Sequence, residues 1–205
     1  MRLLPCGDTA LLVELDTLGE VLRLAAALRA NRPVGVAEIV PAARTVLLRC
    51  DPEVRRLAKI ADSVRRIATN PEQLPTAGTL ELRVRYDGED LAEAAGATGL
   101  AERELVDRHL QAWWTVAFCG FSPGFGYLVA DPDAGWPQVP RRNSPRSRVP
   151  AGSVALAGEF SGVYPRESPG GWQLIGRTEA VVFDLARDPP ALLRPGVRVR
   201  FVEAR

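Results

Sequence analysis

The segment Trp136–Pro150, with the sequence WPQVPRRNSPRSRVP, carries four arginines, four prolines and no acidic residue. Proline restricts the backbone, so the guanidinium groups would be held in a fixed array that suits a carboxylate or a phosphate. A solvated basic loop that balances acids elsewhere explains the composition equally well. Nucleic acid is a weaker partner, because a single aromatic residue gives bases little to stack on. The arginines are Arg141, Arg142, Arg146 and Arg148.

The run Gly120–Gly124 matches the G-x-S-x-G pattern of a serine-hydrolase nucleophile. That motif uses the N–H of the residue after the serine as an oxyanion donor, and a helix follows it. Here the residue is Pro123, which has no N–H, and Phe125–Val129 has the pattern of a strand. The one histidine, His109, also precedes the serine. We therefore predict a tight turn between two strands.

A Cys119–His109 pair offers a conceivable nucleophile and base, but no electropositive, thiolate-stabilising surroundings are evident. We favour a small buried hydrophobic role for the cysteine. His109 ends a predicted helix, where a cation is favoured, and spacing alone favours that role over a catalytic one. One histidine and three scattered cysteines without a CxxC motif predict neither a metal site nor a disulfide framework.

Glycine-rich stretches at 151–158, 162–165 and 168–172 indicate tight turns or places where a ligand approaches the backbone. The sequence contains neither a GxxxxGK[ST] loop nor a strand-linked GxGxxG motif. Any ATP chemistry would therefore take place on another chain or at an unrecognised site.

The 205 residues are 46% hydrophobic and 25% charged, with a formal net charge of +1. This balance argues against a global binder of nucleic acid or anionic membranes. No apolar run reaches the length of a membrane span, and the N-terminus lacks a signal-peptide pattern. We expect a cytoplasmic globular protein.

The first part of the chain alternates strand and helix patterns, in the order β-α-β-β-α. This order indicates a ferredoxin-like split βαβ layer. The helix after Asp51-Pro52-Glu53 begins with a capping carboxylate and a proline at the first helical position. The predicted elements are strands Thr9–Leu15, Val36–Val40 and Thr45–Arg49, and helices Glu20–Arg29 and Asp51–Asn70.

Residues 70–79 have the composition of a linker, and we place a domain boundary there, giving domains 1–75 and 76–205. Many short apolar runs between glycines and prolines then predict a β-barrel or sandwich. Helices are predicted over Glu89–Ala95 and Ala101–Leu110. The predicted strands are Leu80–Val84, Thr115–Cys119, Phe125–Val129, Ser153–Ala157, Trp172–Ile175, Val181–Leu185 and Val197–Phe201.

The run from His109 through GFSPGFGYL to PRRNSPRSRVPAGSVALAGEFSGVYPRESPGGWQLIGRT resembles the carboxyltransferase C/D-type family. The segments Gly7–Glu14, Glu38–Pro41 and Asp51-Pro52 resemble its amino-terminal domain. The similarity spans nearly the whole chain. It implies an α+β fold, in which an N-terminal α/β domain, here ferredoxin-like, precedes a cyclophilin-like β-barrel domain.

The resemblance implies a component of an ATP-dependent 5-oxoprolinase, a hydrolase that converts 5-oxoproline to glutamate and is active only with its partners. The implied partners are a carboxyltransferase A/B-type protein, which is the 5-oxoprolinase C subunit, together with the 5-oxoprolinase A subunit. ATP would be bound by the complex, and this chain has no biotin-carrier motif. The family also includes the histidine-kinase inhibitor KipI and proteins called allophanate hydrolase subunit 1. Kinase inhibition, or a carboxyltransferase or amide-hydrolase role, are therefore alternatives.

The resemblance also places the family's pocket on positions of this chain, with chemistry suited to a small carboxylate or amide. We expect Arg141 and Arg146 to hold a carboxylate, Tyr127 and Ser153 to orient a carbonyl, and His109 to shuttle a proton. The remaining matched positions, expected to bind substrate, are Phe121, Pro123, Gly124, Pro145, Tyr164, Gly170, Gly171, Trp172 and Arg177.

The chain departs from the family pattern next to this pocket. Where the family commonly has Gln-Thr before Gly-Val-Tyr-Pro, this chain has Phe160-Ser161, which removes a hydrogen-bonding side chain. An enzyme requires Arg141, Arg146 and His109 to converge on a concave pocket. An inhibitor requires a broad, partly apolar face instead.

Overall fold

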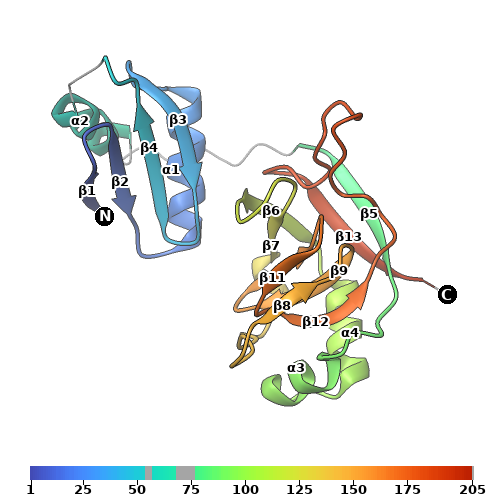
Figure 1. The fold of residues 1–205 in the computed structure, drawn as a ribbon. Coiled ribbons are helices and arrows are strands. Elements are labelled where there is room, and N and C mark those ends of the chain that lie inside the picture. The colour runs from blue at the N-terminus through green and yellow to red at the C-terminus, as the bar shows by residue number, and fades with distance from the viewer. Residues whose placement is uncertain (54–56, 68–76, 205) are drawn as a thin grey trace. The chain divides into compact units, whose positions relative to one another are not determined.

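The computed structural model describes residues 1–53, 57–67 and 77–204 of the chain (Figure 1). The chain divides into two compact units, Met1–Pro75 and Thr76–Arg205. Each unit buries its own cluster of apolar side chains, so each has a separate hydrophobic core.

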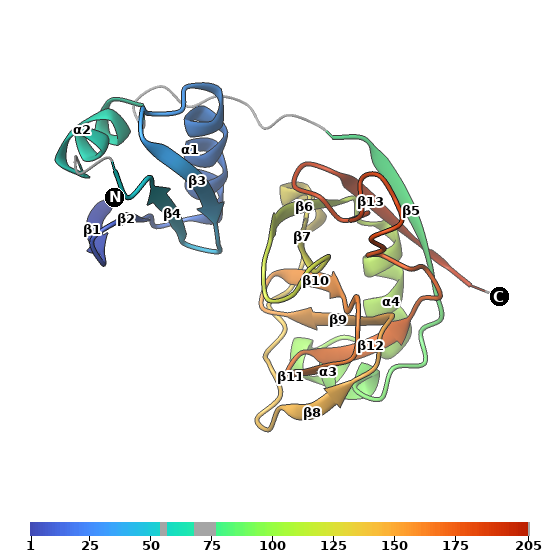
Figure 2. The same ribbon diagram turned by 45° about the horizontal axis from the view of Figure 1, so that its top comes forward.

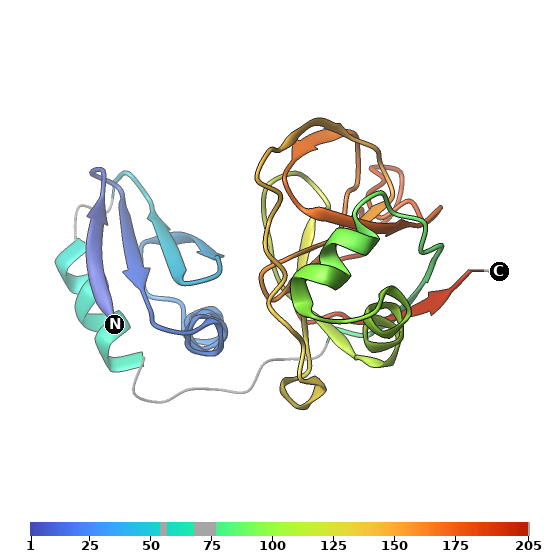
Figure 3. The same ribbon diagram turned by 90° about the horizontal axis from the view of Figure 1, so that it is seen from below.

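The first unit is a four-stranded antiparallel sheet in the order β1-β2-β4-β3. Because β4 pairs with both neighbours in antiparallel fashion, β2 and β3 run parallel to each other on either side of it. Both helices lie on one face of the sheet (Figure 3). The elements are β1 (Arg2–Cys6), β2 (Ala10–Glu14), α1 (Leu18–Ala30), β3 (Val36–Pro41), β4 (Thr45–Cys50) and α2 (Leu57–Ile67).

Helix α1 begins with a capping box. The Thr17 hydroxyl accepts a hydrogen bond from the Glu20 N–H, and the Glu20 carboxylate accepts one from the Thr17 N–H, both at 3.2 Å. Its Val21 and Leu28 side chains are fully buried against the sheet. The helix predicted over Glu20–Arg29 is confirmed, and it begins two residues earlier.

The first unit differs from the sequence predictions at its first strand. Strand β1 was not predicted, because Pro5 interrupts its pattern; proline is compatible with its position at the edge of the sheet. At the predicted start of α2, the Asp51 carboxylate accepts a hydrogen bond from the Glu53 N–H at 3.0 Å. Residues 54–56 and most of the predicted linker lie outside the described part of the chain.

The second unit is built on a seven-stranded sheet in the order β12-β9-β10-β7-β6-β13-β5, with β8 and β11 forming a separate two-stranded sheet (Figure 2). Helix α3 contacts β12, and α4 contacts β13. The elements are β5 (Thr79–Val84), α3 (Leu91–Thr98), α4 (Glu102–Gln111), β6 (Trp114–Cys119), β7 (Gly126–Ala130), η1 (Pro132–Ala134), β8 (Arg146–Val149), β9 (Ser153–Ala157), β10 (Phe160–Val163), β11 (Ser168–Gly170), β12 (Gln173–Arg177) and β13 (Arg198–Glu203).

The two outer strands of this sheet, β12 and β5, meet at a single bridge between Arg85 and Arg177. Each residue donates its N–H to the carbonyl oxygen of the other at 2.9 Å. The sheet therefore curves into a nearly closed β-barrel. Strand β5 pairs with β13 on its other side, and these two strands run parallel.

Two clusters of side chains fill the second unit. The larger one includes the fully buried Trp114 and Phe201 and lies between the strands and helices α3 and α4. The smaller one is mainly aromatic, with Phe125, Tyr164 and Trp172 at its centre. Both helices predicted for this unit are present.

Most strand predictions for the second unit are confirmed, β9 with its bounds unchanged. Strands β8, β10 and β11 were not predicted, because they are short and contain arginine, serine, glycine or proline. The strand predicted over Val181–Leu185 is wrong. Only Phe183 makes a β-bridge, with Ala191, and Leu185 is 84% exposed. The chain there turns back on itself, with Asp184 donating its N–H to the Pro190 carbonyl.

Candidate functional site

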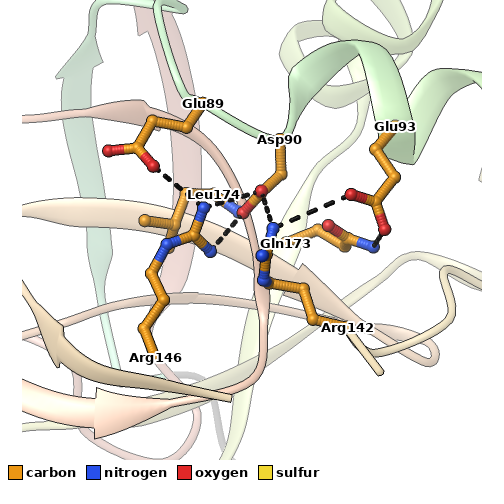
Figure 4. Close-up of polar contacts among 7 residues, drawn as sticks. All are labelled: Glu89, Asp90, Glu93, Arg142, Arg146, Gln173 and Leu174. Carbon is orange, nitrogen blue, oxygen red and sulfur yellow. Dashed lines mark hydrogen bonds and ion pairs between the residues drawn. The ribbon is translucent and has the colours of Figure 1, made fainter. Parts of the chain in front are cut away.

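The arginine-rich segment is anchored by a buried carboxylate at the start of α3 (Figure 4). Asp90 is 2% exposed, and Arg146 donates to both of its oxygens at 2.7 and 2.8 Å. Arg142 also donates to Asp90, and the Leu174 N–H completes the set at 2.8 Å. Glu89 binds Arg146 from the solvent side at 3.0 Å.

These contacts set the charge state of Asp90. Burial raises the pKa of its carboxyl group, but the hydrogen bonds from Arg146 and Leu174 and the charges of Arg146 and Arg142 outweigh burial. The pKa therefore lies below its ordinary value, and the carboxylate is charged at neutral pH. A buried ion pair with this many hydrogen bonds orders the segment around it, so Arg146 and Arg142 hold α3, β8 and β12 together.

Arg141 has different surroundings from its neighbours. It is exposed, and no acidic residue in the described ranges forms an ion pair with it. It lies within electrostatic range of the Tyr127 and Tyr164 hydroxyl groups. Burial raises the pKa of Tyr164 to about 12, with Arg141 acting in the opposite direction, and burial also raises the pKa of Tyr127. Both tyrosines thus keep their hydroxyl protons at neutral pH.

The two tyrosines belong to the aromatic cluster of the second unit. The Phe125 ring lies 5.1 Å from that of Tyr127 and 5.3 Å from those of Tyr164 and Trp172, in edge-to-face contacts. Phe160 also packs against Tyr127, with ring centroids 5.6 Å apart. Phe160 therefore adds an apolar wall beside Tyr127.

The Gly120–Gly124 run forms a tight turn between β6 and β7, as the sequence predicts. The Ser122 N–H donates to the Gly120 carbonyl at 2.7 Å, which forces Phe121 to a φ of 67°. This left-handed conformation is strained for a bulky residue. The Phe121 ring is 57% exposed and lies 6.1 Å from the Tyr164 ring. The turn thus holds an exposed aromatic ring at the rim of the cluster despite the backbone strain, and the neighbouring Ser122 hydroxyl is buried with no hydrogen-bond partner among the described residues.

His109 lies in the larger core, away from solvent. Its Nδ1 is 2.7 Å from the Tyr86 hydroxyl and its Nε2 is 2.9 Å from the Ser161 hydroxyl. Burial lowers the pKa of the fully buried ring to about 3, so the imidazole is neutral. The Phe201 ring packs 4.3 Å from it. With both nitrogens bound and no exposed surface, His109 ties α4 to β10 and to the Tyr86 loop.

The other expected positions divide between the aromatic cluster and the seam of the barrel. Gly170 allows the Tyr164 hydroxyl to approach, since an added Cβ would lie 2.2 Å from it, and Gly171 lies against Pro145. Gly124 packs on Phe183 in the same way, beside the exposed Pro123. Arg177 instead pairs with Asp87 at 2.8 Å at the seam, opposite the buried Ser153 at the start of β9.

Of the expected positions, Tyr164 and Trp172 are buried in the aromatic cluster, Tyr127 is half-buried, and Phe121 is exposed at its rim. Arg141 is exposed and within electrostatic range of the two tyrosines. Arg146 instead pairs with Asp90, His109 lies inside the core, and Arg177 lies at the seam. An exposed cation near a half-buried neutral phenol and an exposed aromatic ring can bind a small carboxylate, with the phenol as an additional hydrogen-bond donor.

The sequence reasoning missed Asp90, the residue that organises the arginine-rich segment. The helix predicted over Glu89–Ala95 placed Asp90 in its first turn, where an acid is favoured by the helix dipole. Helix α3 begins at Leu91, so Asp90 occupies the N-cap position, but its side chain makes no capping hydrogen bond. Its partners lie 52 and 56 residues further along the chain, a separation that no local pattern reveals.

Comparison with known proteins gives the chain its family. Residues 1–193 match the family described as carboxyltransferase domain, subdomain C and D. The chain belongs to this family. It is 43% identical to the 5-oxoprolinase B subunit of Escherichia coli O157:H7 over 206 residues, which cover 96% of this chain and 93% of that protein. The carboxyltransferase C/D resemblance inferred from the motifs is thus confirmed.

Two solved structures of similar fold come from longer proteins. The crystal structure of TTHA0988 is 37% identical with a TM-score of 0.75, and the match covers 96% of this chain but 40% of that one. The Kluyveromyces lactis urea amidolyase has a TM-score of 0.80 at 20% identity, over 98% of this chain and 15% of that one. The latter likeness concerns the fold alone.

Two further properties of the described ranges bear on the site. Within them, no group of three or more histidine, cysteine, aspartate or glutamate side chains is placed to hold a metal ion. Of the helices within those ranges, none has the length and apolar character that a membrane crossing requires.

Proposed function

We propose that this carboxyltransferase C/D-family chain is a component of an ATP-dependent 5-oxoprolinase, with the surface around Arg141 binding the carboxylate of 5-oxoproline. The 43% identity to a 5-oxoprolinase B subunit over 96% of the chain supports the reaction. The observation that carries the site is the exposed Arg141, without an ion pair in the described ranges and within electrostatic range of the half-buried Tyr127.

In this proposal the chain binds and positions 5-oxoproline, and its partner proteins bind ATP. Arg141 binds the carboxylate, Tyr127 donates a hydrogen bond to a substrate oxygen, and the exposed Phe121 ring packs on the lactam ring. Tyr164 and Trp172, which are buried, support this surface from within. The lactam C–N bond is hydrolysed, with ATP as co-substrate of the complex. The sequence lacks the common phosphate-binding loops, so we assign ATP to the partner proteins. We further propose these to be a carboxyltransferase A/B-type protein and the 5-oxoprolinase A subunit, without which the chain is inactive.

The proposal extends to the architecture. We propose that the two units are separate domains, split near residue 75. In the first, β2-α1-β3 with β4 inserted between the strands supports a ferredoxin-like fold. In the second, the barrel closed by the Arg85–Arg177 bridge supports a cyclophilin-like fold. In this assignment, four of the expected site residues stabilise the structure around the site instead of binding substrate. They are His109, Arg146, Ser153 and Arg177.

The test is ATP-dependent release of glutamate from 5-oxoproline by this chain mixed with its proposed partners. Arg141→Ala should lower kcat/KM about 10- to 100-fold, as expected for the loss of a charge-assisted hydrogen bond to substrate. The matched control is Arg148→Ala, because Arg148 is exposed on the same segment and pairs outward with Glu167 at 2.9 Å. An assembled complex that turns over equally well with Arg141→Ala contradicts the site, and one without glutamate release contradicts the reaction.

A further inference from the structure

The seam of the barrel leaves one edge of β5 open. The Gly78 and Val84 carbonyls accept hydrogen bonds from Arg198 and Ala204, on the β13 side. Because successive residues of a strand direct their backbone groups to opposite edges, those of Glu81 and Arg83 point away from β13. On that far side β5 has no strand partner within the described ranges before the bridge at Arg85.

A groove of about 1060 Å³ lies at this seam. Its walls come from β5, from the end of β13 and from the segment that follows β12. The groove is strongly charged and carries three arginines. The charged lining residues are Glu81, Arg83, Arg85, Arg177, Glu179 and Glu203.

The charges in the groove are unevenly compensated. Arg85 and Arg177 face each other across the bridge, an arrangement of like charges that destabilises a strand pair. Asp87 neutralises Arg177, at 2.8 Å, and Arg103 pairs with Glu203, at 3.0 Å. No ion pair joins Arg83 or Arg85 to another described residue. Two arginines beside an open strand edge are therefore not ion-paired within the described ranges, although Glu81, Glu179 and Glu203 line the same groove.

We propose that this open edge of β5 is a docking site for an extended segment of another protein chain. The segment adds to the sheet as a further strand that pairs up to Arg83, because Arg177 occupies both backbone groups of Arg85. Acidic side chains of the segment lie opposite Arg83 and reach the Arg85 guanidinium beyond it. Free backbone groups on an edge strand are a template for such pairing, and cross-strand charge pairs select the sequence. Glu81, further along the same face, disfavours an acid at the next outward position.

The first test measures binding to the full chain of a capped heptapeptide, Thr-Val-Glu-Val-Glu-Val-Thr, and of its Lys-for-Glu counterpart. We expect the Glu peptide to bind and to slow amide hydrogen exchange at Glu81 and Arg83. The Leu82 amide, which faces β13, serves as the internal reference. Equal binding of both peptides overturns the acidic chemistry, and protection elsewhere, or no binding, overturns the docking edge.

Two variants separate backbone pairing from charge. Glu81→Pro removes a free N–H but keeps both arginines, and proline is tolerated at such edge positions. It should abolish binding, whereas Glu81→Ala should not. The double variant Arg83→Glu/Arg85→Glu should reverse the preference to the Lys peptide by about tenfold. Unchanged binding in Glu81→Pro, with a melting curve like that of the wild type, overturns strand addition. These readouts use this chain alone, so they are independent of the proposed catalytic function.

Discussion

The segment around residues 141–148 places its arginines in two different environments. Arg146 and Arg142 bind Asp90, which is 2% exposed, while Arg141 is exposed to solvent and has no ion pair in the described ranges. The two environments differ in whether an acidic side chain forms an ion pair with the arginine, and not in the arginines themselves. An arginine whose charge is compensated inside the protein supports the fold, and a neighbour without a counter-charge is available to bind a ligand.

Of the residues compared, Asp90 is expected to contribute most to the free energy of unfolding. Asp90→Ala removes the buried partner of two partly buried guanidinium groups and leaves them only the exposed Glu89 and Glu93, so it should lower the free energy of unfolding by about 3–5 kcal/mol. Denaturant unfolding of the chain measures this. Arg148→Ala, the surface control, should change it by less than about 1 kcal/mol. If Asp90→Ala lowered the free energy of unfolding as little as Arg148→Ala, the Asp90 ion pairs would not stabilise the fold as this comparison requires.

The second prediction concerns the roles of Arg146 and Arg141. Arg146→Ala should lower both stability and turnover, because its loss releases β8 from Asp90. Arg141→Ala should lower kcat/KM about 10- to 100-fold and leave the melting temperature unchanged. Melting curves and kinetics on the same samples separate the two. If Arg146→Ala reduced turnover without loss of stability, the ion-paired arginine would also act on substrate.

A third prediction uses pH to isolate His109 from the carboxylates. The buried ring has a pKa of about 3, against about 6.5 in an unfolded chain. The unfolded state therefore takes up a proton that the folded state does not, and stability falls as pH drops from 6.5 towards 3. The slope is about 1.4 kcal/mol per pH unit for one proton.

The matched measurement compares unfolding of wild type and His109→Gln between pH 6.5 and 4.5. The variant should lose this dependence. The pKa of Asp90 lies below its ordinary value, so its contribution is present above about pH 3.9 and is lost only as the pH falls further. If the free energies of unfolding of wild type and His109→Gln changed equally with pH between 6.5 and 4.5, the burial of a neutral His109 would be contradicted.

The smallest expected effect belongs to Phe121. Asparagine tolerates a positive φ better than phenylalanine, so Phe121→Asn should relieve strain and change stability by less than about 1 kcal/mol. Removal of the exposed ring should still lower kcat/KM several-fold if it encloses substrate. Steady-state kinetics beside a melting curve checks both expectations. Unchanged kinetics would remove Phe121 from the site.

Local patterns were sufficient for most of the fold. Alternation and run length predicted the strand Ser153–Ala157 without error, and a proline after the serine ruled out a nucleophile elbow at Gly120–Gly124. The same rules failed at Val181–Leu185, where an apolar run forms a turn. Apolar residues in a turn and in a strand look alike when the partner strand is unknown.

The candidate site was less accessible to sequence. Composition left an anion site and a solvated basic loop as equal alternatives for the arginines, and Arg146 in fact binds the protein's own Asp90, 56 residues earlier in the chain. Helical spacing placed His109 at a helix end, but it could not show that Tyr86 and Ser161 occupy both ring nitrogens. Each of these outcomes depends on contacts between distant segments, which spacing does not encode.

The parallel pairing of β5 with β13 also determines how the second unit responds to force. These are the first and last strands of that unit, and their register runs from Thr79 opposite Arg198 to Val84 opposite Glu203. Tension applied at the start of β5 and the end of β13 would load every hydrogen bond of this ladder in shear at once. The unit would have to break the whole ladder before it could extend, which makes this strand pair its mechanical clamp.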